Sequence, residues 1–167
     1  MREMIMERLN VMDSVVASLK DGEATFIMTA SPKGEEYVYS VGVSVSTDNA
    51  FEIAITGLSP EQMHFFGNHF AQHIKERVIE LDEPITYVEE VFNVPVALVK
   101  VSQEHMHDGT FTVAETTLDM TDKQIPMFQL VLPDPNGRFP WQEHVDSKWK
   151  KYQSIFFDVQ QIENLYN

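Results

Sequence analysis

Two histidines four residues apart are the first feature of the sequence that could do chemistry. His69 and His73 share one strip of an α-helix with Glu76, because positions four and seven apart nearly superpose at about 3.6 residues per turn. Two imidazoles and a carboxylate in this arrangement can hold a metal ion. Phe70, however, occupies the place of the glutamate that follows the first histidine of a zinc-protease helix. We therefore expect boundary histidines with satisfied hydrogen bonds, no metal and no other cofactor.

A second cluster of ionisable side chains lies in the segment "EHMHDG" (104–109). In an extended conformation His105 and His107 would share one face, since alternate residues of a strand point the same way. With Glu104 and Asp108 they could form a metal or acid–base site, because histidine is the commonest metal ligand and exchanges protons near neutral pH. Polar loop residues are more often simply solvated, and this is the interpretation that we favour.

Glu52 stands between Phe51 and Ile53 in a segment that is typical of a strand. If the two apolar side chains face the core, the carboxylate faces the opposite side, near Tyr37 or Tyr39 of the preceding strand. A cross-strand hydrogen bond with a tyrosine is the simpler interpretation. The functional alternative is a carboxylate of raised pKa in a pocket, acting as an acid or a base.

The stretch "LPDPNGRFPW" (132–141) is the part of the chain densest in residues that restrict the backbone. Its "DPNG" portion has the residues of a tight turn, with glycine where a positive φ is needed. Phe139 and Trp141 follow as rigid apolar anchors, and Arg138 could bond the aspartate of the turn. We favour a clasp that pins this loop to the core. In the alternative, Arg138 and Trp141 form the wall of a binding pocket together with Tyr39.

Hydrophobic spacing and turn residues predict the elements that must position these side chains. An amphipathic helix is expected over residues 3–19, and a capping box with proline at the first helical position starts a second helix at Ser59. The remaining expected elements are strands over 24–31, 36–46, 51–57, 85–92, 94–104 and 125–133, a short helix over 113–119 and a C-terminal helix capped by Asp146. Together they predict a single α+β domain over residues 1–167, with a mainly antiparallel sheet of five to six strands and helices packed mostly on one face.

Composition excludes several classes of function. The 167 residues include 26 acidic and 12 basic side chains, a net charge of −14, which repels phosphate backbones and predicts no binding to nucleic acid. The chain has no cysteine, so disulfides, thiolate metal sites and cysteine nucleophiles are excluded. No apolar run is long enough to span a membrane, and the N-terminus lacks the pattern of a signal peptide. We expect no membrane association and a cytoplasmic location.

Three segments together resemble a family of mostly bacterial proteins, the domain of unknown function 4262. "FQLVLPDPNGRFPW" (128–141) is similar to the family's signature, "YSVGV" (39–43) to one of its strands, and residues 51–74 to its acidic strand, turn and helix, with Asn68 at the helix asparagine. The resemblance covers about residues 37–149, flanked by the N- and C-terminal helices. Family members often carry Gly-His-Pro before the strand glutamate, where this chain has "TDNA". The family name implies no activity.

Taken together, the residues favour a non-enzymatic, cytosolic binding protein that acts on another protein through its acidic surface. The same character would suit a phage or mobile-element inhibitor of a host protein, and a homodimer is compatible with the sequence. One alternative is a small hydrolase with Glu52, His69 and His73 lining a pocket beside Arg138. Another is a small-molecule sequestering domain built on Trp141 and the rest of the pocket wall described above. Convergence of these side chains in one cavity would separate the alternatives.

Overall fold

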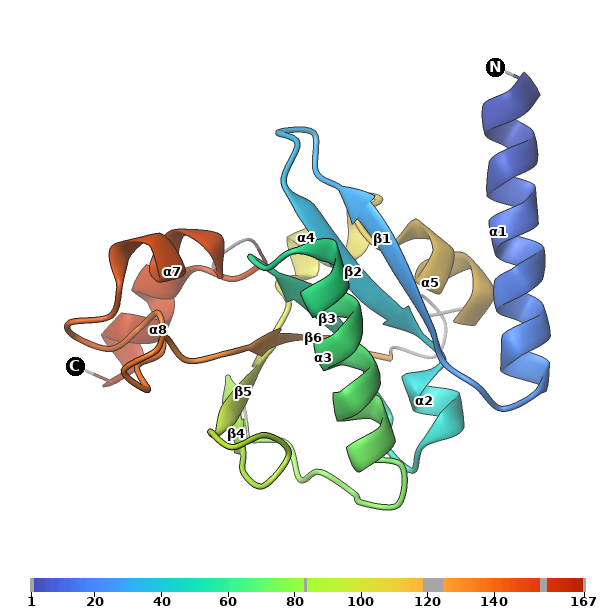
Figure 1. The fold of residues 1–167 in the computed structure, drawn as a ribbon. Coiled ribbons are helices and arrows are strands. Elements are labelled where there is room, and N and C mark those ends of the chain that lie inside the picture. Colours follow the sequence, from blue (N-terminus) through green and yellow to red (C-terminus); the bar gives the residue numbers. More distant parts are fainter. Residues whose placement is uncertain (1, 83, 119–124, 154–155, 167) are drawn as a thin grey trace.

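A six-stranded mixed sheet lies at the centre of the fold (Figure 1). The structure is a computed structural model that describes residues 2–82, 84–118, 125–153 and 156–166. Its strands are β1 (Thr25–Ala30), β2 (Glu36–Val41), β3 (Glu52–Thr56), β4 (Ile85–Val88), β5 (Val96–Lys100) and β6 (Met127–Val131). They are ordered β1-β2-β3-β6-β5-β4, with only the β3–β6 pair parallel in the described chain. The predicted α+β class, the mainly antiparallel sheet and the β1–β2–β3 meander are confirmed.

The helices lie on both faces of this sheet. The described helices are α1 (Arg2–Lys20), α2 (Val43–Ser46), α3 (Pro60–His73), α4 (Gln103–His107), α5 (Thr112–Leu118), α7 (Ser147–Tyr152) and α8 (Val159–Tyr166). Val38 of β2 packs in one core cluster with residues of α3, while its neighbours Tyr37 and Tyr39 pack in another with residues of α1 and α5. Because both faces of β2 are apolar and buried, both need a cover. Val43 of α2 and Trp149 of α7 also pack in the cluster of α3, so the helices are divided between the two faces.

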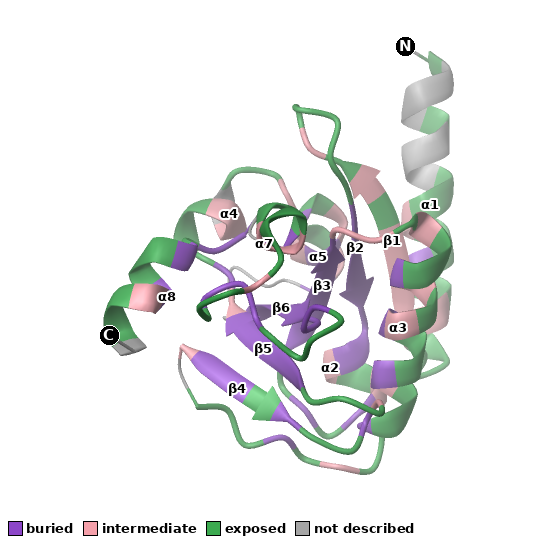
Figure 2. Cartoon of the chain, turned by 60° about the vertical axis from the view of Figure 1, so that its left-hand side comes forward, coloured by how far each residue is buried: buried purple, intermediate pink, exposed green. Residues whose placement is uncertain are grey.

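Helix α3 begins as its sequence predicts. The Ser59 hydroxyl accepts a hydrogen bond from the Gln62 amide (3.3 Å), and the Gln62 side chain accepts one from the Ser59 amide (3.2 Å), which completes the capping box. Met63 and Phe70 are buried against the sheet. Figure 2 shows that buried residues are concentrated in the central strands, with exposed residues toward the outside of the covering helices.

The expected strand over 36–46 ends early, at Val41. Gly42 has φ of 114°, and a Cβ there would lie 2.9 Å from the Glu23 carbonyl oxygen, so the chain needs glycine at this close approach. The following residues form the short helix α2 instead of continuing the strand. The close backbone approach that the glycine suggests is therefore present, although it ends the strand.

The last two expected elements also differ from the structure. The strand over 94–104 ends at Lys100 and is followed by α4. The C-terminal helix is capped by Asp146 as predicted, but it is divided into α7 and α8, with residues 154–155 outside the described chain. The short helix predicted over 113–119 is α5, and residue 119 lies outside the described residues. Among the described residues, no helix combines the length and the apolar character needed to cross a membrane.

Candidate functional site

Glu52 is fully buried and its carboxylate binds the backbone at the start of α2. Its Oε1 accepts hydrogen bonds from the Ser40 hydroxyl (2.7 Å) and from the amides of Gly42 (3.0 Å) and Val43 (2.9 Å). Its Oε2 accepts one from the Ser44 amide (2.9 Å). The expected tyrosine partners bond elsewhere, since the Tyr37 hydroxyl donates to the Thr110 carbonyl oxygen.

This environment makes Glu52 a structural carboxylate. Burial raises its pKa, and the hydrogen bonds from Ser40 and from the α2 amides limit the rise. Both oxygens are occupied by donors that also close the turn between β2 and α2. A general acid or base must reach a substrate, and this carboxylate is enclosed by the backbone that it stabilises.

The other candidate catalytic residues lie on the outside of α3. His69 is exposed; its Nε2 lies 2.9 Å from the Val91 carbonyl oxygen and its ring stacks on Phe65. His73 and Glu76 are exposed. Across the described chain, no group of three or more histidine, aspartate or glutamate side chains is placed to hold a metal ion.

The loop of "LPDPNGRFPW" has the geometry of a clasp. The Gly137 amide bonds the Asp134 carbonyl oxygen (2.8 Å) and Gly137 has φ of 80°, as the turn prediction requires. Phe139 and Trp141 are buried and stack on each other, with ring centroids 5.1 Å apart and planes 3° apart. Arg138 is exposed, and its guanidinium donates to the Glu143 carbonyl oxygen (3.1 Å) instead of the Asp134 carboxylate.

Asp134 holds this loop together through backbone amides. Its Oδ1 accepts from Asn136 and Arg138 and its Oδ2 from Asp146, each at 2.9 Å. These bonds, the one from Asp146 foremost, lower the pKa of Asp134.

We expect Asp134 to stabilise the fold at neutral pH and to lose this contribution in acid. A carboxylate whose pKa is lower in the folded state stabilises the fold above its unfolded pKa of about 3.9, and this contribution is lost as the pH falls. Melting temperatures measured from pH 7 downward should therefore fall more steeply for the wild type than for Asp134→Asn, in which the side chain cannot ionise. Parallel curves for the two proteins would contradict this assignment.

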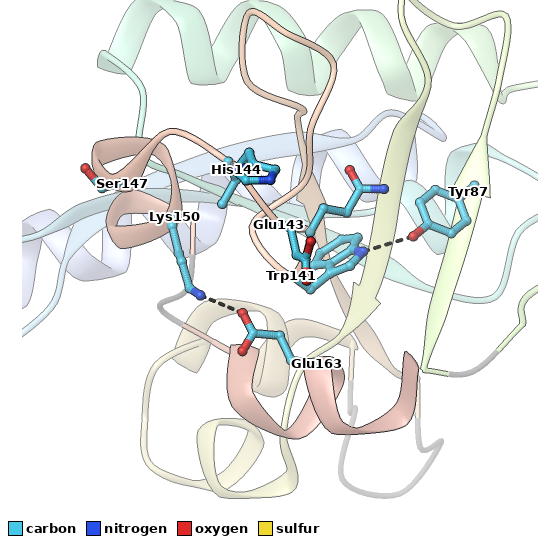
Figure 3. A pocket seen from close by; sticks show the side chains of 9 residues that line it. Tyr87, Trp141, Glu143, His144, Ser147, Lys150 and Glu163 are labelled. Carbon is cyan, nitrogen blue, oxygen red and sulfur yellow. Dashed lines mark hydrogen bonds and ion pairs between the residues drawn. The ribbon is translucent and has the colours of Figure 1, made fainter. Parts of the chain in front are cut away.

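A first cavity of about 610 Å³ lies beside the clasp (Figure 3). Its lining includes Trp141 and Tyr87 on one side and Lys150 and Glu163 on the other. Figure 3 shows that these polar groups are already paired: the Trp141 Nε1 donates to the Tyr87 hydroxyl (3.0 Å), and Lys150 Nζ bonds Glu163 (2.5 Å). A ligand here would have to compete with both interactions, so we regard this cavity as a secondary candidate.

A second and larger cavity, about 870 Å³, lies between α1, the β1–β2 hairpin and the segment that joins α4 to α5. We name it the aromatic cleft. Its lining residues are Val11, Met12, Ile27–Pro32, Tyr37, Tyr39, His105, Asp108–Thr110, Thr112, Val113 and Phe156. Phe156 comes from the C-terminal segment, where its amide donates to the Gln129 side chain of β6 (3.3 Å).

The polar side chains in the lining of the aromatic cleft include two tyrosines, His105 and Asp108. The Tyr39 hydroxyl accepts a hydrogen bond from the Val113 amide (3.4 Å). Burial raises the pKa of Tyr37 and of Tyr39 to about 12, so both phenols stay protonated at neutral pH. His105 Nδ1 lies 3.2 Å from the Asp108 carboxylate at the rim. The cleft thus offers apolar walls with hydrogen-bond donors and one acidic group.

The predicted site residues therefore do not share one cavity among the two described above. Tyr39 lines the aromatic cleft and Trp141 the first cavity. Within the described chain, the lining of these two cavities includes none of Glu52, His69 and His73, nor Arg138. Sequence reasoning noticed His105 and Asp108 as a loop cluster but had no signal for Phe156, which reaches the cleft only through the tertiary fold.

The profile described as "Domain of unknown function (DUF4262)" matches residues 19–146, well over half of the chain. The chain belongs to this family. The resemblance inferred from the sequence is confirmed, and the DUF4262 match includes β1 to β6, α3 and the clasp loop. No curated protein and no solved structure matches the chain.

Proposed function

We propose that this DUF4262 protein is a non-catalytic binding protein that holds its ligand in the aromatic cleft. The observation that carries the proposal is a cavity of about 870 Å³ with aromatic and aliphatic walls and polar side chains that include two tyrosines and Asp108. Ligand sites commonly have volumes of about 300–1,000 Å³ and this composition.

The separation of the candidate catalytic groups supports binding over catalysis. An enzyme needs a nucleophile or base and a stabilising group around one point. Glu52 is enclosed by the α2 backbone, and His69 lies on the exposed side of α3. The positions of Glu52 and His69 give no support to the alternative of a hydrolase pocket.

Composition bears on the charge of the ligand or partner and on the location of the protein. The excess of 26 acidic over 12 basic residues favours ligands or protein partners of positive charge. We also propose a cytoplasmic location, because a chain without cysteine suits a reducing compartment. Interaction with another protein, including inhibition of a host protein by a phage product, stays a prediction.

We expect a small neutral aromatic molecule, benzyl alcohol, to bind in the cleft. A titration followed by two-dimensional amide NMR should shift the signals of cleft residues such as Tyr39 and Thr110. The variant Thr112→Trp fills the cleft and should weaken binding at least tenfold, because Thr112 is part of its lining. The matched control Thr116→Trp changes an exposed residue of the same helix outside that lining and should leave binding unchanged. Absence of binding, or equal binding by both variants, would refute the proposal.

A further inference from the structure

The ionisable side chains in the described lining of the aromatic cleft are Asp108, His105 and the two tyrosines, and His105 Nδ1 lies 3.2 Å from the Asp108 carboxylate. Among its described lining residues there is no lysine or arginine, and Asp108 is the acidic side chain. Asp108 is held in place by the Thr110 amide, which donates to its Oδ1 (2.9 Å), and its side chain is 41% exposed. Desolvation acts to raise the pKa of Asp108, but the hydrogen bonds from Thr110 and His105 outweigh it and lower the pKa, so the group is ionised at neutral pH.

Nearby carboxylates contribute to the pKa values of the two tyrosines at the floor of the cleft. Burial is the largest cause of the raised pKa of each tyrosine. The charge of Asp108 contributes further to the raised pKa of Tyr37, and the charge of Glu115 contributes further to that of Tyr39. A negative potential disfavours the ionised form of a phenol, so these charges act in the same direction as burial. The same potential attracts a cation.

Aromatic rings provide a second attraction for positive charge. Tyr37, Tyr39 and Phe156 all line the cleft, with the Tyr37 and Phe156 rings 5.1 Å apart and the Tyr37 and Tyr39 rings 6.2 Å apart. The face of an aromatic ring carries partial negative charge and binds ammonium groups within about 6 Å. Met12 and Ile27 supply apolar wall for the rest of such a ligand.

We infer that the ligand of the aromatic cleft is an organic cation, an ammonium group carried on an apolar body. This inference rests on the proposed ligand site. In the inferred complex, the apolar body of the ligand lies against the aliphatic wall, and its positive charge lies between the aromatic floor and Asp108 at the rim. Such a cation could be a free amine or the side chain of a lysine on a partner, and the experiment must separate these sources.

Three probes that share one aromatic body test the charge preference. Benzyltrimethylammonium, benzyl alcohol and benzoate are titrated separately into the full chain, and each Kd is measured by amide NMR in low salt. We expect the cation to bind several-fold more tightly than the alcohol and at least tenfold more tightly than benzoate. Raising the salt to about 0.5 M should weaken the cation alone, because ions screen exposed charges. A peptide, acetyl-Ala-Lys-Ala-amide, is titrated in parallel; binding tighter than that of benzyltrimethylammonium would assign the cation to a partner protein.

Asp108→Asn isolates the charge. The carboxamide oxygen can still accept the Thr110 amide, so that hydrogen bond of the loop is kept, while the charge and its ion pair with His105 are lost. We expect about a threefold to fivefold loss of affinity for benzyltrimethylammonium and no change for benzyl alcohol. The matched control Asp48→Asn removes one charge at an exposed position outside the cleft lining and should change neither affinity.

The outcomes separate the inference from the proposed function. Cleft binding of benzyl alcohol with equal or tighter binding of benzoate would overturn the cation preference and leave the ligand site standing. A cation preference that survives in Asp108→Asn would overturn the role of this carboxylate. Failure of every probe to bind in the cleft would overturn both the inference and the proposed function.

Discussion

Replacement of Trp141 by alanine should lower the free energy of unfolding by about 3–5 kcal/mol, as truncation of large buried aromatic residues does. Trp141 is only 7% exposed, stacks on Phe139 and donates a hydrogen bond to the Tyr87 hydroxyl. Alanine would leave a cavity between the loop and the sheet and remove the hydrogen bond to the Tyr87 hydroxyl. Urea unfolding monitored by far-UV circular dichroism measures the loss.

Two neighbouring positions serve as controls for Trp141→Ala. Arg138→Ala should change stability by less than about 1 kcal/mol, since the exposed guanidinium makes a single bond to a backbone carbonyl. Gly137→Ala should cost about 1 kcal/mol, because a side chain with φ of 80° is strained even though the space around it is open. If Arg138→Ala were as costly as Trp141→Ala, the clasp would be the wrong description of this loop.

Glu52→Ala should lower the free energy of unfolding by at least about 3 kcal/mol. The substitution would leave the Ser40 hydroxyl and three backbone amides of Gly42, Val43 and Ser44 without their buried acceptor. Each buried donor left without a partner costs about 1–3 kcal/mol. Hydrogen exchange should also show faster opening of the α2 amides, which a loss of general packing would not select.

Glu52→Gln tests the charge of this buried carboxyl. Because burial raises the pKa of Glu52 in the folded protein, its contribution to stability is complete below the unfolded pKa of about 4.3 and is lost as the pH rises through the folded pKa. The stability of the wild type relative to Glu52→Gln should therefore decrease as the pH is raised from about 4. A relative stability that increases with pH would show that the hydrogen bonds outweigh burial.

Local signals in the sequence were sufficient for much of the fold. The Ser59 and Gln62 pair defines the start of α3 within four residues of chain, and its prediction is confirmed. The same holds for the turn at Gly137 and the burial of Trp141, because turn chemistry and large aromatic side chains act over short distances.

Contacts between distant segments account for the differences. "VSVS" (43–46) alternates like a strand, but Glu52 accepts its first amides and stabilises a helical turn there. The partners of Glu52 depend on the register of β2 and β3, which spacing alone does not specify. Phe156 joins Tyr37 in the aromatic cleft across more than a hundred residues of chain, so the candidate site could not be assembled from the sequence.

The residues that line the aromatic cleft come from inside and outside the region that the family match covers, which bears on how ligand selectivity could change. The family match begins at residue 19 and ends at residue 146, yet Val11 and Met12 of α1 form one wall and Phe156 forms another. The matched region thus supplies most of the lining, including both tyrosines and Asp108, and the two ends of the chain add Val11, Met12 and Phe156. The C-terminal end also packs on the clasp, since Phe157, Val159 and Ile162 belong to the same core cluster as Phe139 and Trp141. A change of ligand selectivity at the two ends would therefore have to keep the apolar contacts that Val15, Phe156 and Phe157 make in the core.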